Sequence, residues 1–233
     1  MPDDFRIGSL RMRLGVIIFT GIAFVAGGIT APATNAVSPP HVLFGAWVQQ
    51  GSAPTHADAV RALEGRLGFT LGIDNHYRPW TNTFWRDEQD DIASGRTPMV
   101  SWTARGTTAV AIASGSQDAT IARVAEAVKA LKSRVLVRFA YEMDQPKSGP
   151  RYAWAAPRGK ALIVAETGVQ EDPADPARKA AWFADAAAWI HSHTAIRAVS
   201  YFDGVSPKGY DFRLDSSDAS VAAWRAMAVE TYG

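Results

Sequence analysis

The sequence predicts an α/β fold, specifically a (β/α) barrel of the TIM type shortened to about six parallel strands. Apolar runs of strand length alternate along the chain with amphipathic helical segments, a pattern typical of parallel βαβ units. The runs are strongly apolar, as expected for strands whose two faces are both covered. Two of the runs end in a glutamate, and barrels of this kind carry their active residues at the carboxyl ends of the strands.

The clearest predicted strand runs from Val135 to Glu142. Alternate side chains of a strand point to opposite faces, so one face here is wholly apolar and the other carries Arg138 and Glu142. Charged groups on the inward face of a buried strand are costly unless they are paired. We therefore expect a barrel strand that ends in a catalytic carboxylate. Arg138 is expected to point inward and hold Glu166 or Asp74, either within a site or as a structural ion pair.

Residues 1–36 have the features of a secretory signal peptide. Basic residues precede the apolar run Leu14 to Ala26, and small residues follow it up to Ala36, where we place the cleavage. The alternative is an uncleaved anchor, because the stretch from Leu14 to Ala33 is long enough to span a bilayer. The small residues favour cleavage, which predicts a secreted or extracytoplasmic protein that has no membrane attachment once the signal is removed.

Residues 37–233 are predicted to form one domain of ordinary globular composition. The chain is 47% hydrophobic and 20% charged. Removing residues 1–36 leaves equal numbers of basic and acidic residues, so nothing predicts a nucleic-acid partner, which would need a basic face. The absence of cysteine excludes disulfides and thiolate metal sites. We expect a monomer with no cofactor and no metal ion.

The predicted elements alternate in order along this domain. The expected strands are residues 42–48, 69–74, 98–102, 135–142, 161–166 and 198–202. The expected helices are residues 55–67, 83–94, 118–131, 176–191 and 219–230. Asp118 and Asp175 are expected to cap their helices, Pro176 favours a first turn, and an aromatic loop is expected over residues 75–80.

Six strands are two fewer than a closed barrel of this type contains. An eight-unit barrel needs about 250 residues, or roughly 30 per unit, so the domain is about two units short. The shortfall falls between Met143 and Lys160, because a parallel neighbour needs a crossover of about a dozen residues and this segment allows one short return. The two glutamate strands are therefore expected to be neighbours, or to leave a gap between them.

Glu142 and Glu166 both end apolar strands and together suggest the carboxylate pair of a retaining glycosidase. That chemistry needs two carboxyl groups about 5–5.5 Å apart, one acting as acid/base and the other as nucleophile. Aromatic rings that could bind the apolar faces of sugars follow nearby strands, at Trp80, Trp85, Trp102 and Phe202. The alternative is that the glutamates cap strands in solvated loops and that the aromatic residues pack beneath loops.

These motifs resemble those of glycoside hydrolase family 26, a β-mannanase-like group of retaining enzymes on eight-stranded barrels. The resemblance covers nearly all of residues 41–233, with the motifs in the family's order. It implies that Glu142, within Val135 to Asp144, is the acid/base and that Glu166, within Ala165-Glu-Thr-Gly168, is the nucleophile. Further similar segments are Phe44–Trp47, Pro98–Trp102, Lys179–Trp182, Tyr201–Phe202 and Leu214–Ser217. The implied activity is endo-β-mannanase-like or β-glucanase-like double displacement on a polysaccharide or oligosaccharide.

The sequence departs from the family's pattern around the acid/base. The family usually has histidine just before it and asparagine two positions after it, where this chain has Tyr141 and Asp144. Asp144 would either raise the pKa of Glu142 through its negative charge or disturb a contact to substrate. We include Tyr141 and Arg138 among the expected substrate-binding residues.

The family's fifth and sixth βα units have no match in this chain. In the family's clan, the sixth strand supplies a tyrosine that hydrogen-bonds the nucleophile, so that tyrosine has no match either. A missing wall would admit water and weaken the electrostatic stabilisation that a dry site provides. The chain is therefore expected to be a secreted glycoside hydrolase whose activity is impaired, or a non-catalytic carbohydrate-binding relative, or the product of an internally deleted gene.

Overall fold

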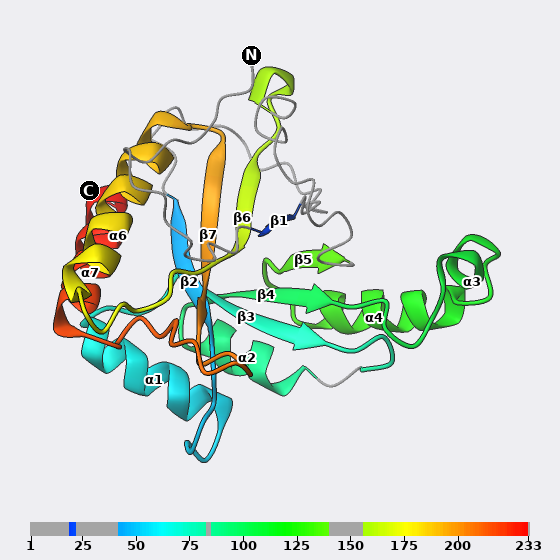
Figure 1. Cartoon of the computed structure of the whole chain (residues 1–233). Coiled ribbons are helices and arrows are strands. Elements are labelled where there is room, and N and C mark those ends of the chain that lie inside the picture. Colours follow the sequence, from blue (N-terminus) through cyan, green and yellow to red (C-terminus); the bar gives the residue numbers. More distant parts are fainter. Residues whose placement is uncertain (1–18, 22–41, 83–84, 140–155, 233) are drawn as a thin grey trace.

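The computed structural model describes residues 19–21, 42–82, 85–139 and 156–232 (Figure 1). Its strands form one sheet in the order β1-β6-β7-β2-β3-β4-β5. The strands are β1 (Phe19–Gly21), β2 (Leu43–Val48), β3 (Ile73–Arg78), β4 (Thr97–Trp102), β5 (Leu136–Phe139), β6 (Leu162–Thr167) and β7 (Ile196–Asp203). Among the described strands, β2 to β7 run parallel to one another, and β1, which lies within the predicted signal peptide, pairs antiparallel with β6.

Helices follow most of these strands and cover the outside of the curved sheet (Figure 1). They are α1 (His56–Leu67), α2 (Arg86–Ala93), α3 (Ala109–Ala113), α4 (Asp118–Ala130), the 3₁₀ turn η1 (Ala156–Arg158), α6 (Pro176–Ser192) and α7 (Asp218–Tyr232). Both ends of helix α1 are capped by residues that favour those positions. The Thr55 side chain accepts a hydrogen bond from the Asp58 amide at the start, and Gly68 ends the helix in a left-handed conformation with φ 77°.

Two apolar layers lie on opposite faces of the sheet. The larger layer joins the outer side of β2 and β7 to helices α1, α6 and α7, with Phe44, Tyr201, Phe183 and Trp224 at its centre. A smaller layer fills the concave side and consists of Ile73, Met99, Leu136, Ile163, Ala165 and Ala198, with Leu43 packed against them. An apolar interior enclosed by parallel strands and an outer layer of helices define a (β/α) barrel. The predicted barrel of about six parallel strands is confirmed.

The barrel is nearly closed, and its gap among the described strands lies between β5 and the edge formed by β6 and the short β1 beside it. In the described part of the chain, β5 pairs only with β4, whereas β6 pairs with β7 and with the short β1. Within the described residues, β5 and β6 are therefore not hydrogen-bonded neighbours, which corresponds to the expected arrangement with a gap. We refer to this opening as the β5–β6 gap.

The predicted limits of the second strand were wrong. That strand was expected over Phe69 to Asp74 and a loop over residues 75–80, but β3 begins at Ile73 and continues to Arg78. The outward side chains of β3 are polar, and polar residues at alternate positions are more typical of a loop than of a buried strand. These residues are Asp74, His76 and Arg78. They tolerate burial because carboxylates and a histidine from α1 and α2 pair with them.

The residues that cap the helices agree only in part with those predicted from the sequence. Asp175 occupies the N-cap position of α6 and Pro176 its first turn, as expected, but the Asp175 side chain makes no capping hydrogen bond. Asp118 begins α4 without capping it, because Gln117 holds the N-cap position. At α7 the Ser217 hydroxyl accepts a hydrogen bond from the Ser220 amide at 3.2 Å.

Candidate active site

Glu166 lies near the carboxyl end of β6, where a bulge turns its side chain into the barrel. Ile163 and Ala165 already face the interior, so strict alternation would send Glu166 to the outer face. The register between β6 and β7 shifts between Val164 and Thr167, because β6 contains one extra residue there. Such bulges re-aim a side chain and are common next to active sites. This one places Glu166 on the same side as the interior layer.

Two donors from other strands hold one oxygen of this carboxylate. The Tyr77 hydroxyl on β3 donates to Glu166 Oε2 at 2.6 Å, and Arg138 Nη2 on β5 donates to the same oxygen at 3.1 Å. Among the described residues, Oε1 has no hydrogen-bond donor. The expected inward orientation of Arg138 and its ion pair with Glu166 are confirmed. Asp74, the other partner considered for Arg138, faces the opposite side of β3.

The Tyr77 hydroxyl is held in its protonated form. Burial raises the pKa of the Tyr77 phenol above its usual value, and the negative charge of Glu166 raises it further. The phenol therefore acts as a hydrogen-bond donor to Glu166 at any ordinary pH. The guanidinium of Arg138 also lies over the Tyr77 ring, 5.6 Å from its centroid, an arrangement that favours the cation.

A deeper polar layer supports Arg138. Its Nε donates to Ser101 Oγ on β4 at 3.0 Å, and that hydroxyl donates to Asn75 Oδ1 on β3 at 2.7 Å. Asn75, Ser101 and Arg138 are all buried. Side chains from three strands, β3, β4 and β5, thus fix the orientation of Glu166 on β6, and hydrogen bonds that link buried side chains in this way stiffen a site.

An aromatic surface lies beside the carboxylate. Trp47 on β2 stacks on Phe202 of β7 with ring centroids 4.8 Å apart, and its ring meets Tyr77 edge-on at 5.8 Å. All three rings are half-buried. The structure therefore brings the predicted Phe202 close to the site, together with Trp47.

The other predicted aromatic residues lie elsewhere. Trp80, Trp85 and Trp102 belong to a cluster with Val100 and Val124 on the outer face of the sheet, and none is more than 8% exposed. Trp80 and Trp102 stack at 4.4 Å, and the Trp80 indole donates to Gln117. An aromatic ring that binds a sugar must expose one of its faces. The burial of these three tryptophans does not support the predicted role in sugar binding, which stays a prediction.

Two predicted site residues, Glu142 and Tyr141, lie outside the described residues. The described part of their strand ends at Phe139. Arg138, the last inward-facing residue of the described strand, reaches Glu166 across the β5–β6 gap through its guanidinium.

Tyr77 is the site residue that sequence reasoning missed. In the family's clan the tyrosine that binds the nucleophile comes from the sixth strand, which has no match in this chain. Here β3 supplies a tyrosine instead. The available signal was the spacing of Ile73, Asn75 and Tyr77, which share one face once β3 is extended to Arg78.

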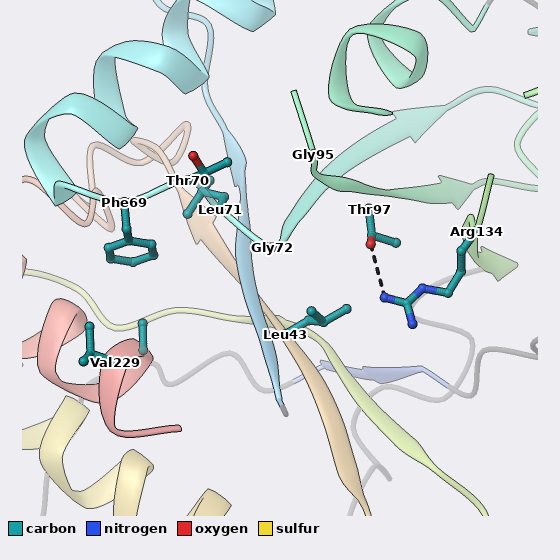
Figure 2. A pocket seen from close by; sticks show the side chains of 10 residues that line it. Leu43, Phe69, Thr70, Leu71, Gly72, Gly95, Thr97, Arg134 and Val229 are labelled. Carbon is teal, nitrogen blue, oxygen red and sulfur yellow. Dashed lines mark hydrogen bonds between the residues drawn. The ribbon is translucent and has the colours of Figure 1, made fainter. Parts of the chain in front are cut away.

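A cavity of about 600 Å³ opens at the other end of the barrel (Figure 2). Its lining includes Leu43 and Thr97, the first residues of β2 and β4, and Gly72, which precedes β3. Arg134 Nη2 donates to Thr97 Oγ1 at its rim, at 3.3 Å. Active residues of barrels lie at the opposite, carboxyl ends, so this cavity is separate from the Glu166 site.

Neither the protein-family models nor the curated proteins compared with the chain give a match. The resemblance to glycoside hydrolase family 26 therefore rests on the sequence motifs and remains a prediction. No helix in the described ranges is both long enough and apolar enough to cross a membrane.

Proposed function

We propose that this chain is a secreted glycoside hydrolase that cleaves a β-linked polysaccharide of the mannan or glucan type with retention of configuration. The observation that carries the proposal is the placement of Glu166. Its carboxylate lies inside a (β/α) barrel near the carboxyl end of a strand, and Tyr77 and Arg138 bind one of its oxygens. A nucleophilic carboxylate must be held in a fixed orientation toward the anomeric carbon.

The proposed reaction uses two displacements. Glu166 Oε1 attacks the anomeric carbon while Glu142 donates its proton to the departing glycosidic oxygen, which breaks the glycosidic bond and forms a glycosyl ester. Water then attacks the same carbon, Glu142 takes the proton from that water, and the ester bond to Glu166 breaks. Because Tyr77 and Arg138 both bind Oε2, Oε1 remains available for the attack.

The aromatic surface supports a sugar substrate. Trp47, Tyr77 and Phe202 present half-buried rings next to Glu166. Apolar C–H faces of a sugar ring pack well on such rings, and large rigid aromatic side chains lose little conformational entropy on binding.

A non-catalytic carbohydrate-binding protein is the second candidate. The observation that favours it is the β5–β6 gap, since β5 and β6 are not paired in the described part of the chain. Water entering through this gap would weaken the interactions that stabilise charge in the transition state while leaving the aromatic surface able to bind.

Hydrolysis of mannan, glucomannan and mixed-linkage glucan separates these candidates. We expect release of reducing ends by the wild-type chain, and loss of at least ~10³-fold in kcat for Glu166→Gln, because the nucleophile is removed. Glu126→Gln, an exposed change on α4, should leave the rate unchanged and serves as the control.

The proposed role of Glu142 as the proton donor is tested by comparing substrates whose leaving groups differ in their need for protonation. Glu142→Gln should slow hydrolysis of polysaccharides much more than hydrolysis of aryl glycosides whose phenol leaves without protonation. Saturable binding without turnover would support the carbohydrate-binding candidate instead. Equal turnover in the wild-type and Glu166→Gln chains would overturn the proposed chemistry.

A further inference from the structure

A second group of polar residues lies on the outer face of β3, between the sheet and helices α1 and α2. Asp74 and His76 project from β3 on the face opposite to Tyr77, and His56 begins α1. His56 Nε2 lies 2.8 Å from Asp74 Oδ2, and His76 Nε2 lies 3.7 Å from the same oxygen. The two imidazole centroids are 5.0 Å apart. One ligand atom from each residue lies within 4.8 Å of the others.

These side chains are shielded from water. Asp74 and His76 are buried, and the His56 side chain is 15% exposed. The partly open imidazole gives an ion or a water molecule a short route to the cluster. Nitrogen and carboxylate donors that converge in a largely dry setting are the usual ligands of zinc in proteins.

The surroundings carry an excess of negative charge when both imidazoles are neutral. Four largely buried carboxylates from α1, β3 and α2 lie here (Glu64, Asp74, Glu88 and Asp91), and only two guanidinium groups are nearby. Arg78 pairs with Glu88 and with the more exposed Asp87, Arg96 pairs with Glu64 and Asp91, and Asp74 contacts His56. Glu88 is fully buried, and its Oε2 has no hydrogen-bond partner among the described residues. Buried negative charge is costly unless cations or metal ions balance it. A bound divalent cation would remove this excess.

We propose that His56, Asp74 and His76 bind a divalent transition metal ion, with zinc as the best fit. Ligand atoms about 2.0–2.1 Å from a tetrahedral zinc ion lie roughly 3.3 Å apart. The separations of 2.8 and 3.7 Å from Asp74 Oδ2 lie on either side of that value. Two imidazoles and a carboxylate select zinc over magnesium or calcium, which prefer oxygen ligands only.

Neighbouring side chains orient the site. Asp91 Oδ2 lies 2.6 Å from His76 Nε2, and Arg96 Nε holds the other Asp91 oxygen at 3.0 Å. Binding of the ion by His76 Nε2 would replace the contact between that nitrogen and Asp91 and would leave the Asp91 carboxylate next to the ion, where its negative charge stabilises the bound cation. The ion would tie the start of α1 to β3. Its role is therefore structural, because it lies on the opposite face of β3 from Tyr77.

The first test titrates the full chain, after treatment with a chelator, with Zn²⁺ by calorimetry and with Co²⁺ by visible absorption. We expect one equivalent of Zn²⁺, a higher Tm in its presence, and the intense absorption bands of tetrahedral Co²⁺. A Co²⁺ spectrum identical to that of the hydrated ion would overturn the proposal and show that the cluster is a network of buried ion pairs.

The second test uses a matched pair of histidine variants. His56→Gln removes the most exposed ligand and should weaken Zn²⁺ binding at least tenfold, whereas His191→Gln, at an exposed position of α6, should bind as the wild type does. Circular dichroism of metal-free His56→Gln checks that the variant is folded. Unchanged affinity in a folded His56→Gln chain would contradict the site, and the wild-type Co²⁺ spectrum decides the matter if that variant does not fold.

Discussion

At the scale of single residues, the orientation of Glu166 depends on side chains that are far away in sequence. Tyr77 and Arg138 reach it from β3 and β5. The same dependence on distant partners holds on the outer side of the sheet, where Asp203 at the end of β7 is buried and its Oδ1 accepts a hydrogen bond from the Leu214 amide at 2.6 Å.

Asp203 should make the chain lose stability as pH rises through the acid range. Burial raises the pKa of this carboxyl from 3.8 to about 7, so between these values the folded chain holds a proton that the unfolded chain has released. The free energy of unfolding should therefore fall from about pH 4 to about pH 7, by up to about 4 kcal/mol at ~1.36 kcal/mol per pKa unit. Urea denaturation across this range measures it.

Asp203→Asn isolates this contribution, because the amide keeps an oxygen acceptor for Leu214 and does not titrate. The variant should lose less stability than the wild type over the same pH range. Asp185→Asn removes a carboxylate from an exposed position of α6 and should leave the pH profile unchanged. Parallel profiles for the wild type and Asp203→Asn would rule out this role for Asp203.

At the scale of elements, two local departures from regular strand geometry shape the barrel. The bulge in β6 turns Glu166 inward. In β2, Gly45 allows unusually close approach to its partner strand, since a Cβ atom on Gly45 would lie 2.0 Å from the Ile73 carbonyl oxygen. No real side chain fits there unless the backbone of β3 moves.

Substituting Gly45 and Gly65 should have opposite effects. Gly45→Ala should destabilise the chain by more than ~3 kcal/mol or prevent folding, because the methyl group collides with rigid backbone. Gly65→Ala lies on the exposed side of α1 with open space around it and should stabilise by about 0.5–1 kcal/mol, because alanine favours helix. Urea denaturation of both variants provides the measurement, and equal effects would refute this account of the β2–β3 contact.

At the scale of the whole molecule, the β5–β6 gap divides a sheet that is otherwise continuous. The described contact that spans it near the site is the ion pair between Arg138 and Glu166, which is largely shielded from water. Coulombic attraction is stronger in such surroundings than at a solvated surface, and breaking a buried pair costs roughly 3–5 kcal/mol.

Arg138→Met should loosen the two strands that border the gap. We expect faster amide hydrogen exchange in β5 and β6 than in β2 and β3, because the first two lose the contact that joins them. Hydrogen exchange followed by mass spectrometry resolves these segments. Arg123→Met, an exposed change on α4, should leave the pattern as it is, and a uniform increase over all strands in Arg138→Met would contradict a local role.

Features set by nearby residues could be predicted from the sequence. Strand alternation predicted that Arg138 points inward, and the strand ending in Glu166 was found from its apolar run. Tyr77 was missed because Asp74, His76 and Arg78 make β3 resemble a loop, and their burial depends on partners in other elements. The β6 bulge and the pairing of β1 with β6 also depend on contacts between distant segments.

The ion pair between Arg138 and Glu166 also has a consequence for how this protein can evolve. The carboxylate proposed to do the chemistry also forms the described ion pair that joins β5 to β6. A substitution at either residue therefore changes fitness through folding and through turnover at once. Laboratory selection for heat resistance alone should leave both positions unchanged, so their retention in such an experiment would not by itself demonstrate catalysis.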